Sequence, residues 1–259
     1  MGTERLRQAF TNKAFIAFIT GGDPSLEATR RYIGVLQRAG AALIEIGIPF
    51  SDPIAEGEVI QTASARALAA GTTPTRLLEL VETVRREDGI TVPLAFMTYL
   101  NPVFHAGYDA FLGAAARAGV DALIIPDLPY EEHGELRGAA TRAGVALISM
   151  VAPTSLARTR QIARDAQGFI YLVSSLGVTG VRSEITTDIA PIVAAIRAET
   201  EVPVAVGFGI STPAQARAMA AQADGVIVGS AIVRLIAEHG EAADDAIAAF
   251  VGELAGALR

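Results

Sequence analysis

Four acidic residues within the segment 44–61 are the side chains best placed to transfer protons. Glu45 lies inside an apolar run, where an unpaired charge is costly. Asp52, Glu56 and Glu58 follow in a loop rich in glycine and proline. Perturbed buried carboxylates gather at functional sites, so we interpret Glu45 as an acid–base residue. The alternative is a structural glutamate paired with an arginine or a helix N-terminus.

Three glycine clusters indicate a second kind of site. They occupy residues 174–180, 207–211 and 229–230, and each ends an apolar run. Glycines allow main-chain amides to approach phosphate oxygens closely, and a helix N-terminus favours an anion. The alternative is that these are turn glycines only. The expected phosphate ligands are Gly180, Gly209, Gly229 and Ser230.

Eight apolar runs are expected to form the strands that position these residues. They lie within 14–20, 37–47, 93–99, 116–127, 141–152, 168–174, 203–209 and 220–230. Continuous apolar strands imply burial on both faces, hence a parallel sheet, and an apolar-periodic segment follows nearly every run. The pattern predicts one domain over 1–259, a (β/α)8 TIM barrel with an additional N-terminal helix. An open doubly wound sheet is the alternative.

Composition excludes several functional classes. The chain has 259 residues, 51% of them hydrophobic, carries a net charge of −7 and contains no cysteine. Disulfides and thiol chemistry are therefore absent. The arginines form no stripe, which argues against nucleic acid as a partner. No apolar run reaches the ~18 residues that cross a bilayer, and the N-terminus has no signal-peptide pattern, so we expect a cytoplasmic protein without membrane contact.

The few lysines and histidines exclude much of the remaining chemistry. Lys13, the only lysine, precedes the first strand, so it should lie opposite the barrel mouth and cannot form a Schiff base there. The three histidines, His105, His133 and His239, lie on different units without a second metal ligand nearby. We expect His105 at the surface and the other two at exposed helix positions. No GxGxxG pattern follows a strand. Cofactor-free proton transfer by carboxylates, without a metal, remains.

The sequence resembles the tryptophan synthase alpha chain family. The resemblance extends from AFIAFITGGDP (14–24) to GSAIV (229–233). Between them stand IEIGIPFSDP (44–53), IPDLPYEE (125–132), SSLGVTGVRSEI (174–185) and GFGIST (207–212), in the family's order. It implies retro-aldol cleavage of indole-3-glycerol phosphate to indole and glyceraldehyde 3-phosphate. It also implies a beta subunit that holds pyridoxal phosphate and receives the indole in an αββα heterotetramer, with no cofactor in this chain.

The resemblance implies roles for individual residues. Glu45 would protonate indole C3 and help to remove the glycerol hydroxyl proton. Glu56 takes the place of an aspartate that binds the indole N–H, and Tyr171 would lie near the reacting glycerol chain. Further substrate-binding positions implied by the family are Phe18, Tyr99, Thr179, Gly180, Phe208, Gly209, Gly229 and Ser230.

This chain departs from the family in the loop after the second strand. Where ADGP is usual, it has Ala55, Glu56, Gly57 and Glu58. The longer Glu56 keeps the charge but moves its oxygens by about an ångström, and such a displacement can cost about a hundredfold in rate. Glu58 replaces a proline, which either loosens the loop or begins the next helix.

The resemblance also implies a rim that contacts the beta subunit. Its members are Pro49, Asp52, Asn101, Phe104, Asp127 and Pro129. Asp52 and Asp127 could equally be solvated rim acids or turn caps. Three other functions stay open: a free-standing indole-3-glycerol-phosphate lyase, a non-catalytic barrel that activates a partner, and a sugar-phosphate isomerase or epimerase.

Overall fold

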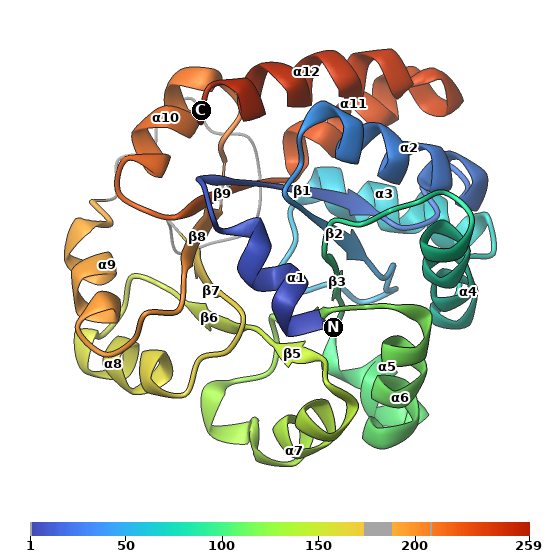
Figure 1. Ribbon diagram of the computed structural model, residues 1–259. Coiled ribbons are helices and arrows are strands. Elements are labelled where there is room, and N and C mark those ends of the chain that lie inside the picture. Colours follow the sequence, from blue (N-terminus) through green and yellow to red (C-terminus); the bar gives the residue numbers. More distant parts are fainter. Residues whose placement is uncertain (1, 174–187, 208) are drawn as a thin grey trace.

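The computed structural model describes residues 2–173, 188–207 and 209–259 and arranges them as a ring of parallel strands inside a ring of helices (Figure 1). The strands are β1 (Ala14–Thr20), β2 (Leu43–Gly47), β3 (Leu94–Met97), β4 (Ala122–Ile124), β5 (Ala146–Leu147), β6 (Ser149–Val151), β7 (Ile170–Val173), β8 (Val204–Gly207) and β9 (Gly225–Val228). The α-helices are α1 (Gly2–Ala9), α2 (Leu26–Ala39), α3 (Glu58–Ala69), α4 (Pro74–Arg86), α5 (Leu100–Ala106), α6 (Tyr108–Ala118), α7 (Gly134–Ala143), α8 (Leu156–Arg164), α9 (Ala190–Arg197), α10 (Pro213–Ala220), α11 (Ser230–His239) and α12 (Asp244–Gly256). Two 3₁₀ turns, η1 (Tyr130–Glu132) and η2 (Gly240–Ala242), complete the described elements.

The ring closes through a strand that is interrupted once. The strand order is β5-β4-β3-β2-β1-β9-β8-β7-β6, and every described pairing is parallel. The two ends of that order, β5 and β6, are separated in the chain only by Ile148. The single strand expected within 141–152 therefore forms two short ladders, one with β4 and one with β7. The TIM barrel and its N-terminal helix are confirmed, and an open sheet is excluded.

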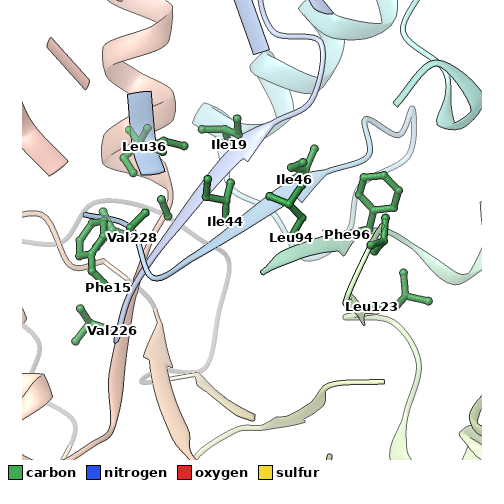
Figure 2. Close-up of a cluster of buried hydrophobic side chains, with 14 of the residues drawn as sticks. Phe15, Ile19, Leu36, Ile44, Ile46, Leu94, Phe96, Leu123, Val226 and Val228 are labelled. Atoms are coloured by element: carbon green, nitrogen blue, oxygen red, sulfur yellow. The ribbon is translucent and has the colours of Figure 1, made fainter. Parts of the chain in front are cut away.

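Alternate residues of each strand face the helices, where most of the apolar core lies. Figure 2 shows part of this layer, with Phe15 and Ile19 of β1 beside Ile44 and Ile46 of β2. The intervening residues face the barrel axis, and a separate interior cluster includes Ile16. Successive strand side chains point to opposite faces. Because Ile44 and Ile46 face the helices, Glu45 between them faces the axis.

Glycines end several helices where the sequence predicts joints between helix and strand. Gly40, Gly119 and Gly144 close α2, α6 and α7 with φ of +105°, +96° and +72°. This left-handed conformation is cheap only for a residue without Cβ. Each joint turns the chain directly into the next strand.

The face of the barrel opposite the strand C-termini is closed by α1 and a buried ion-pair group. Helix α1 lies across the opening of the ring (Figure 1), with Leu6 buried in the interior cluster. Asp121 is fully buried and pairs with Arg5 at 2.6 Å and Arg85 at 2.7 Å. Lys13 also lies on this face, where its Nζ donates to the Ala223 carbonyl. The prediction that Lys13 lies opposite the barrel mouth is confirmed. Among the described residues, no helix combines the length and apolar character that a membrane crossing requires.

Candidate active site

Glu45 is a fully buried carboxyl group on the axis side of β2. Its side chain is 0% exposed, and neither oxygen has a hydrogen-bond partner among the described residues. In the sheet it lies between Phe18 of β1 and Ala95 of β3, neither of which supplies a polar side chain. Burial raises the Glu45 pKa from its usual 4.5 to about 8. The alternative of a glutamate neutralised by an arginine finds no support in the described residues.

Tyr171 shares the barrel interior with Glu45. It lies on the axis side of β7 and is 7% exposed. Burial raises the pKa of its phenol well above the usual value, and the negative charge of Glu45 adds to the effect. The phenol therefore stays protonated at neutral pH and can act as a hydrogen-bond donor. Both side chains face the barrel axis, so a common site for Glu45 and Tyr171 stays a prediction.

Three glycines at strand ends make room for the aromatic side chains of the site. A Cβ on Gly207 would lie 2.7 Å from the Tyr171 hydroxyl, and one on Gly47 would lie 2.7 Å from the Phe18 ring. A Cβ on Gly229 would approach Phe18 to 3.2 Å. Real Cβ atoms almost never come as near as 2.7 Å, so at Gly47 and Gly207 a larger residue would displace the ring. Neither Gly47 nor Gly207 was named as a site residue from the sequence, although Gly207 begins the predicted glycine cluster 207–211 and Gly47 ends an apolar run.

The loop after β2 is held at the C-terminal end of the barrel by Tyr99, which lies between β3 and α5. The Tyr99 hydroxyl accepts hydrogen bonds from the main-chain N–H groups of Ile54 at 2.9 Å and Ala55 at 2.8 Å. It also donates to the Glu56 carboxylate. Burial raises the pKa of Glu56, whereas this hydrogen bond lowers it and the nearby negative charge of Asp127 raises it. The loop ends where α3 begins at Glu58, so the helix-start interpretation of that residue is confirmed.

The predicted phosphate side lies where β8 and β9 end. These strands are neighbours in the ring, with Gly207 paired to Ile227. Gly229 precedes the first turn of α11 and Ser230 begins it, so the unpaired amides of that turn point out of the helix. Gly209 has a φ of +80°, a conformation that suits glycine. The fourth predicted phosphate ligand, Gly180, lies outside the described residues, as do the substrate-binding positions Thr179 and Phe208 and the loop from Ser174 to Thr187.

The predicted partner rim is only partly exposed. Phe104 is 65% exposed, and Asp52, Asn101 and Pro129 are also exposed, whereas Pro49 is buried. Asp127 accepts a hydrogen bond from the main-chain N–H of Leu100 at 2.9 Å, so it caps the first turn of α5. This agrees with the interpretation of Asp127 as a turn cap.

The sequence did not single out Ile54, yet it is 74% exposed on the loop that covers the barrel. The signal in the sequence that could have identified Ile54 as an exposed apolar residue was its position within a polar loop.

The histidines take the places expected of them except for one. His105 and His239 are exposed, whereas the prediction of an exposed His133 is wrong. His133 is 7% exposed, and burial lowers its pKa. It packs beside Tyr130 at the start of α7 because the chain turns inward there, which helix periodicity alone does not reveal. In the described part of the chain, no group of three His, Cys, Asp or Glu residues could hold a metal ion.

Comparisons with known proteins agree with the fold and with the sequence motifs. The family model described as tryptophan synthase alpha chain matches residues 5–257. The tryptophan synthase alpha chain of Lactiplantibacillus plantarum is 56% identical over 229 residues, which cover 88% of this chain and 86% of the relative. A solved chain of Mycobacterium tuberculosis tryptophan synthase has a TM-score of 0.88 and 33% identity, with 100% of this chain and 98% of that chain covered. A chain from the tryptophan synthase α2β2 complex of Pyrococcus furiosus has a TM-score of 0.86 and 34% identity, with 95% and 98% covered.

Proposed function

The chain belongs to the tryptophan synthase alpha chain family, and on this premise we propose how its own residues carry out the family's reaction. That reaction is a carbon–carbon lyase step of tryptophan biosynthesis. It cleaves indole-3-glycerol phosphate to indole and glyceraldehyde 3-phosphate. A proton is added to indole C3, the bond from C3 to the glycerol carbon breaks, and the hydroxyl on that carbon loses its proton to become the aldehyde. No electrons are gained or lost overall.

Glu45 supplies and takes up the protons in this proposal. With a pKa near 8 its carboxyl group is mostly protonated at neutral pH, so it can donate a proton to indole C3. The resulting carboxylate is a strong base in its buried position and accepts the hydroxyl proton of the glycerol chain. Tyr171, whose phenol stays protonated, donates a hydrogen bond to the reacting glycerol oxygen.

Glu56 binds the indole N–H from the loop side of the mouth. Its carboxylate accepts a hydrogen bond from the Tyr99 hydroxyl, and in this proposal it also accepts one from the indole N–H. Partial burial raises the Glu56 pKa, and the Tyr99 hydrogen bond offsets part of that rise. Phe18 and Tyr99 enclose the indole ring with apolar surface.

The phosphate binds at the opposite side of the mouth. Gly229 and Ser230 present the free amides of α11, whose positive end favours an anion, and Gly209 adds a main-chain donor. Thr179, Gly180 and Phe208 belong to the proposed site as well, although they lie outside the described residues. Substrate would thus span the mouth from Glu56 to α11, with its reacting bond over Glu45.

The chain works with a beta subunit in an α2β2 assembly, as in the complex from Pyrococcus furiosus. We place the contact on the exposed part of the rim, with Asp52, Asn101, Phe104 and Pro129, to which Ile54 is added. The chemistry above uses only side-chain and main-chain groups of this chain. Pyridoxal phosphate is proposed for the partner.

The buried, unpaired Glu45 carboxyl carries this proposal. The test compares wild type with Glu45→Gln in release of glyceraldehyde 3-phosphate, with beta subunit at saturation. We expect kcat to fall at least about a thousandfold, the upper range for a positioned acid–base group. The exposed Glu253→Gln serves as the matched control and should keep the wild-type rate.

Three other results would contradict the proposal in different ways. A Glu45→Gln variant within tenfold of wild type would remove Glu45 from the chemistry. A wild type that is inactive with beta subunit present would favour a non-catalytic activator. A wild-type rate that does not depend on beta subunit would favour a free-standing lyase.

A further inference from the structure

Tyr99 is the most connected side chain of the mouth. It directly precedes α5 and is 3% exposed, and its ring packs against Phe50 with centroids 5.2 Å apart. Its hydroxyl makes three contacts with the loop after β2, two as acceptor from Ile54 and Ala55 and one as donor to Glu56. A residue that only lined an indole pocket would need the ring and not the hydroxyl.

The geometry gathers three contacts of this loop segment on one oxygen atom, while the Gln61 side chain holds the Glu56 carbonyl. The amides of Ile54 and Ala55 converge on the Tyr99 hydroxyl, and its proton is then directed at Glu56. A hydroxyl has two acceptor sites and one donor, so these contacts use its full capacity. The three residues are consecutive, and fixing the amides of Ile54 and Ala55, which directly precede Glu56, limits where the Glu56 carboxylate can lie.

The same geometry accounts for the longer acid at position 56. A hydrogen bond to an ionised carboxylate is roughly twice as strong as one between neutral groups, and it also fixes direction. Glu56 has one more rotatable bond than aspartate, and its contact with Tyr99 restrains that freedom. Placement of catalytic groups within about an ångström governs rate, so the restraint has a consequence for catalysis.

We propose that Tyr99 is a positioning residue, whose hydroxyl fastens residues 54–56 over the barrel and thereby holds the Glu56 carboxylate in place for the indole N–H. This inference rests on the proposed function for the role of Glu56. The fastening of the loop itself does not depend on it. The two parts are therefore tested by separate measurements.

The first measurement follows the loop without any substrate. Amide hydrogen exchange at Ile54 and Ala55 is compared between wild type and Tyr99→Phe, which keeps the buried ring and removes the hydroxyl. We expect both amides to exchange at least about tenfold faster, since they lose their acceptor. Tyr32→Phe is the matched control, because Tyr32 is also buried and its hydroxyl donates to the Gly240 carbonyl, remote from the loop. Unchanged exchange at Ile54 and Ala55 would overturn the proposal.

The second measurement is a double-mutant cycle on cleavage, with beta subunit at saturation. Tyr99→Phe should lower kcat about tenfold or more and change KM less than kcat, because the loss is one of orientation. In the Glu56→Gln background the same change should cost less than about threefold, since residues that act as a unit are not additive. Equal losses in both backgrounds, or a Tyr99→Phe variant within twofold of wild type, would overturn the positioning role.

The two measurements separate failure of this inference from failure of the proposed function. If wild type cleaved no substrate, the lyase assignment would fail while the exchange result would still decide whether Tyr99 fastens the loop. If Glu45→Gln is inactive as expected and the cycle is additive, the lyase assignment stands and Tyr99 is only part of the wall. Tyr32→Phe should keep kcat within twofold in either case.

Discussion

Removal of the buried charge at position 45 should change how stability depends on pH. The pKa of Glu45 is raised from 4.5 to about 8 in the folded chain. Below pH 4.5 the group is protonated in both states, so it imposes no cost. As the pH rises from about 4.5 to about 8, the unfolded chain releases the Glu45 proton before the folded chain does. The free energy of unfolding of wild type therefore falls over this range. Above the folded pKa the loss is complete.

The magnitude follows from the two pKa values. A difference of about 3.5 pH units at ~1.36 kcal/mol per unit gives a full cost of about 5 kcal/mol. A cost on the order of 1 kcal/mol is present at about pH 5.5, and most of the full cost is present at about pH 8.5. Glu45→Gln cannot ionise. Its free energy of unfolding relative to wild type should therefore rise by about 3 kcal/mol over this range.

Urea unfolding of the isolated chain, followed by circular dichroism at a series of pH values, measures this difference. Comparison of the variant with wild type at each pH cancels every other titrating group, including His133. Glu253→Gln is the control, because that side chain is exposed and its difference from wild type should stay flat. A constant gap between Glu45→Gln and wild type, or one that narrows as pH rises, would refute the assignment of a raised pKa to Glu45.

Two further predictions concern the walls and the rim of the site. Gly207→Ala places a Cβ 2.7 Å from the Tyr171 hydroxyl. We expect kcat to fall about tenfold or more while the fold persists. Full activity would show that the position of this hydroxyl does not matter. Phe104→Asp introduces a charge on an apolar side chain that is 65% exposed, and we expect the Kd for the beta subunit, measured by calorimetry, to rise at least about tenfold. Basal cleavage by the isolated chain should not change in this second variant, and an unchanged Kd would move the contact elsewhere on the rim.

The sequence by itself determined the barrel and indicated a candidate site for its chemistry. Strands that are buried on both faces must be covered by helices. The regular spacing of apolar runs and glycine joints therefore predicted alternating strands and helices. The carboxyl end of a strand is where such barrels hold their reactive groups, so Glu45 and the later glycine clusters could be proposed as the site without coordinates.

The sequence could not decide which face of β2 is the inner one. Leu43, Ile44, Ile46 and Ile48 are all apolar, so the alternation that distinguishes the faces of an amphipathic strand is missing. Only closure of the ring placed Ile44 and Ile46 against helices and turned Glu45 toward the axis.

Contacts between distant parts of the chain were likewise decided by the tertiary structure. Tyr99 meets Glu56 across 43 positions in the sequence, and no periodicity relates them. The burial of His133 and Pro49 depends in the same way on how segments pack around them. Local patterns carry the information for elements because neighbouring residues share one helix or strand. A hydroxyl or a carboxylate could bond many different partners, so residue type alone does not reveal the pair. Closure of the ring determines which of these residues come together.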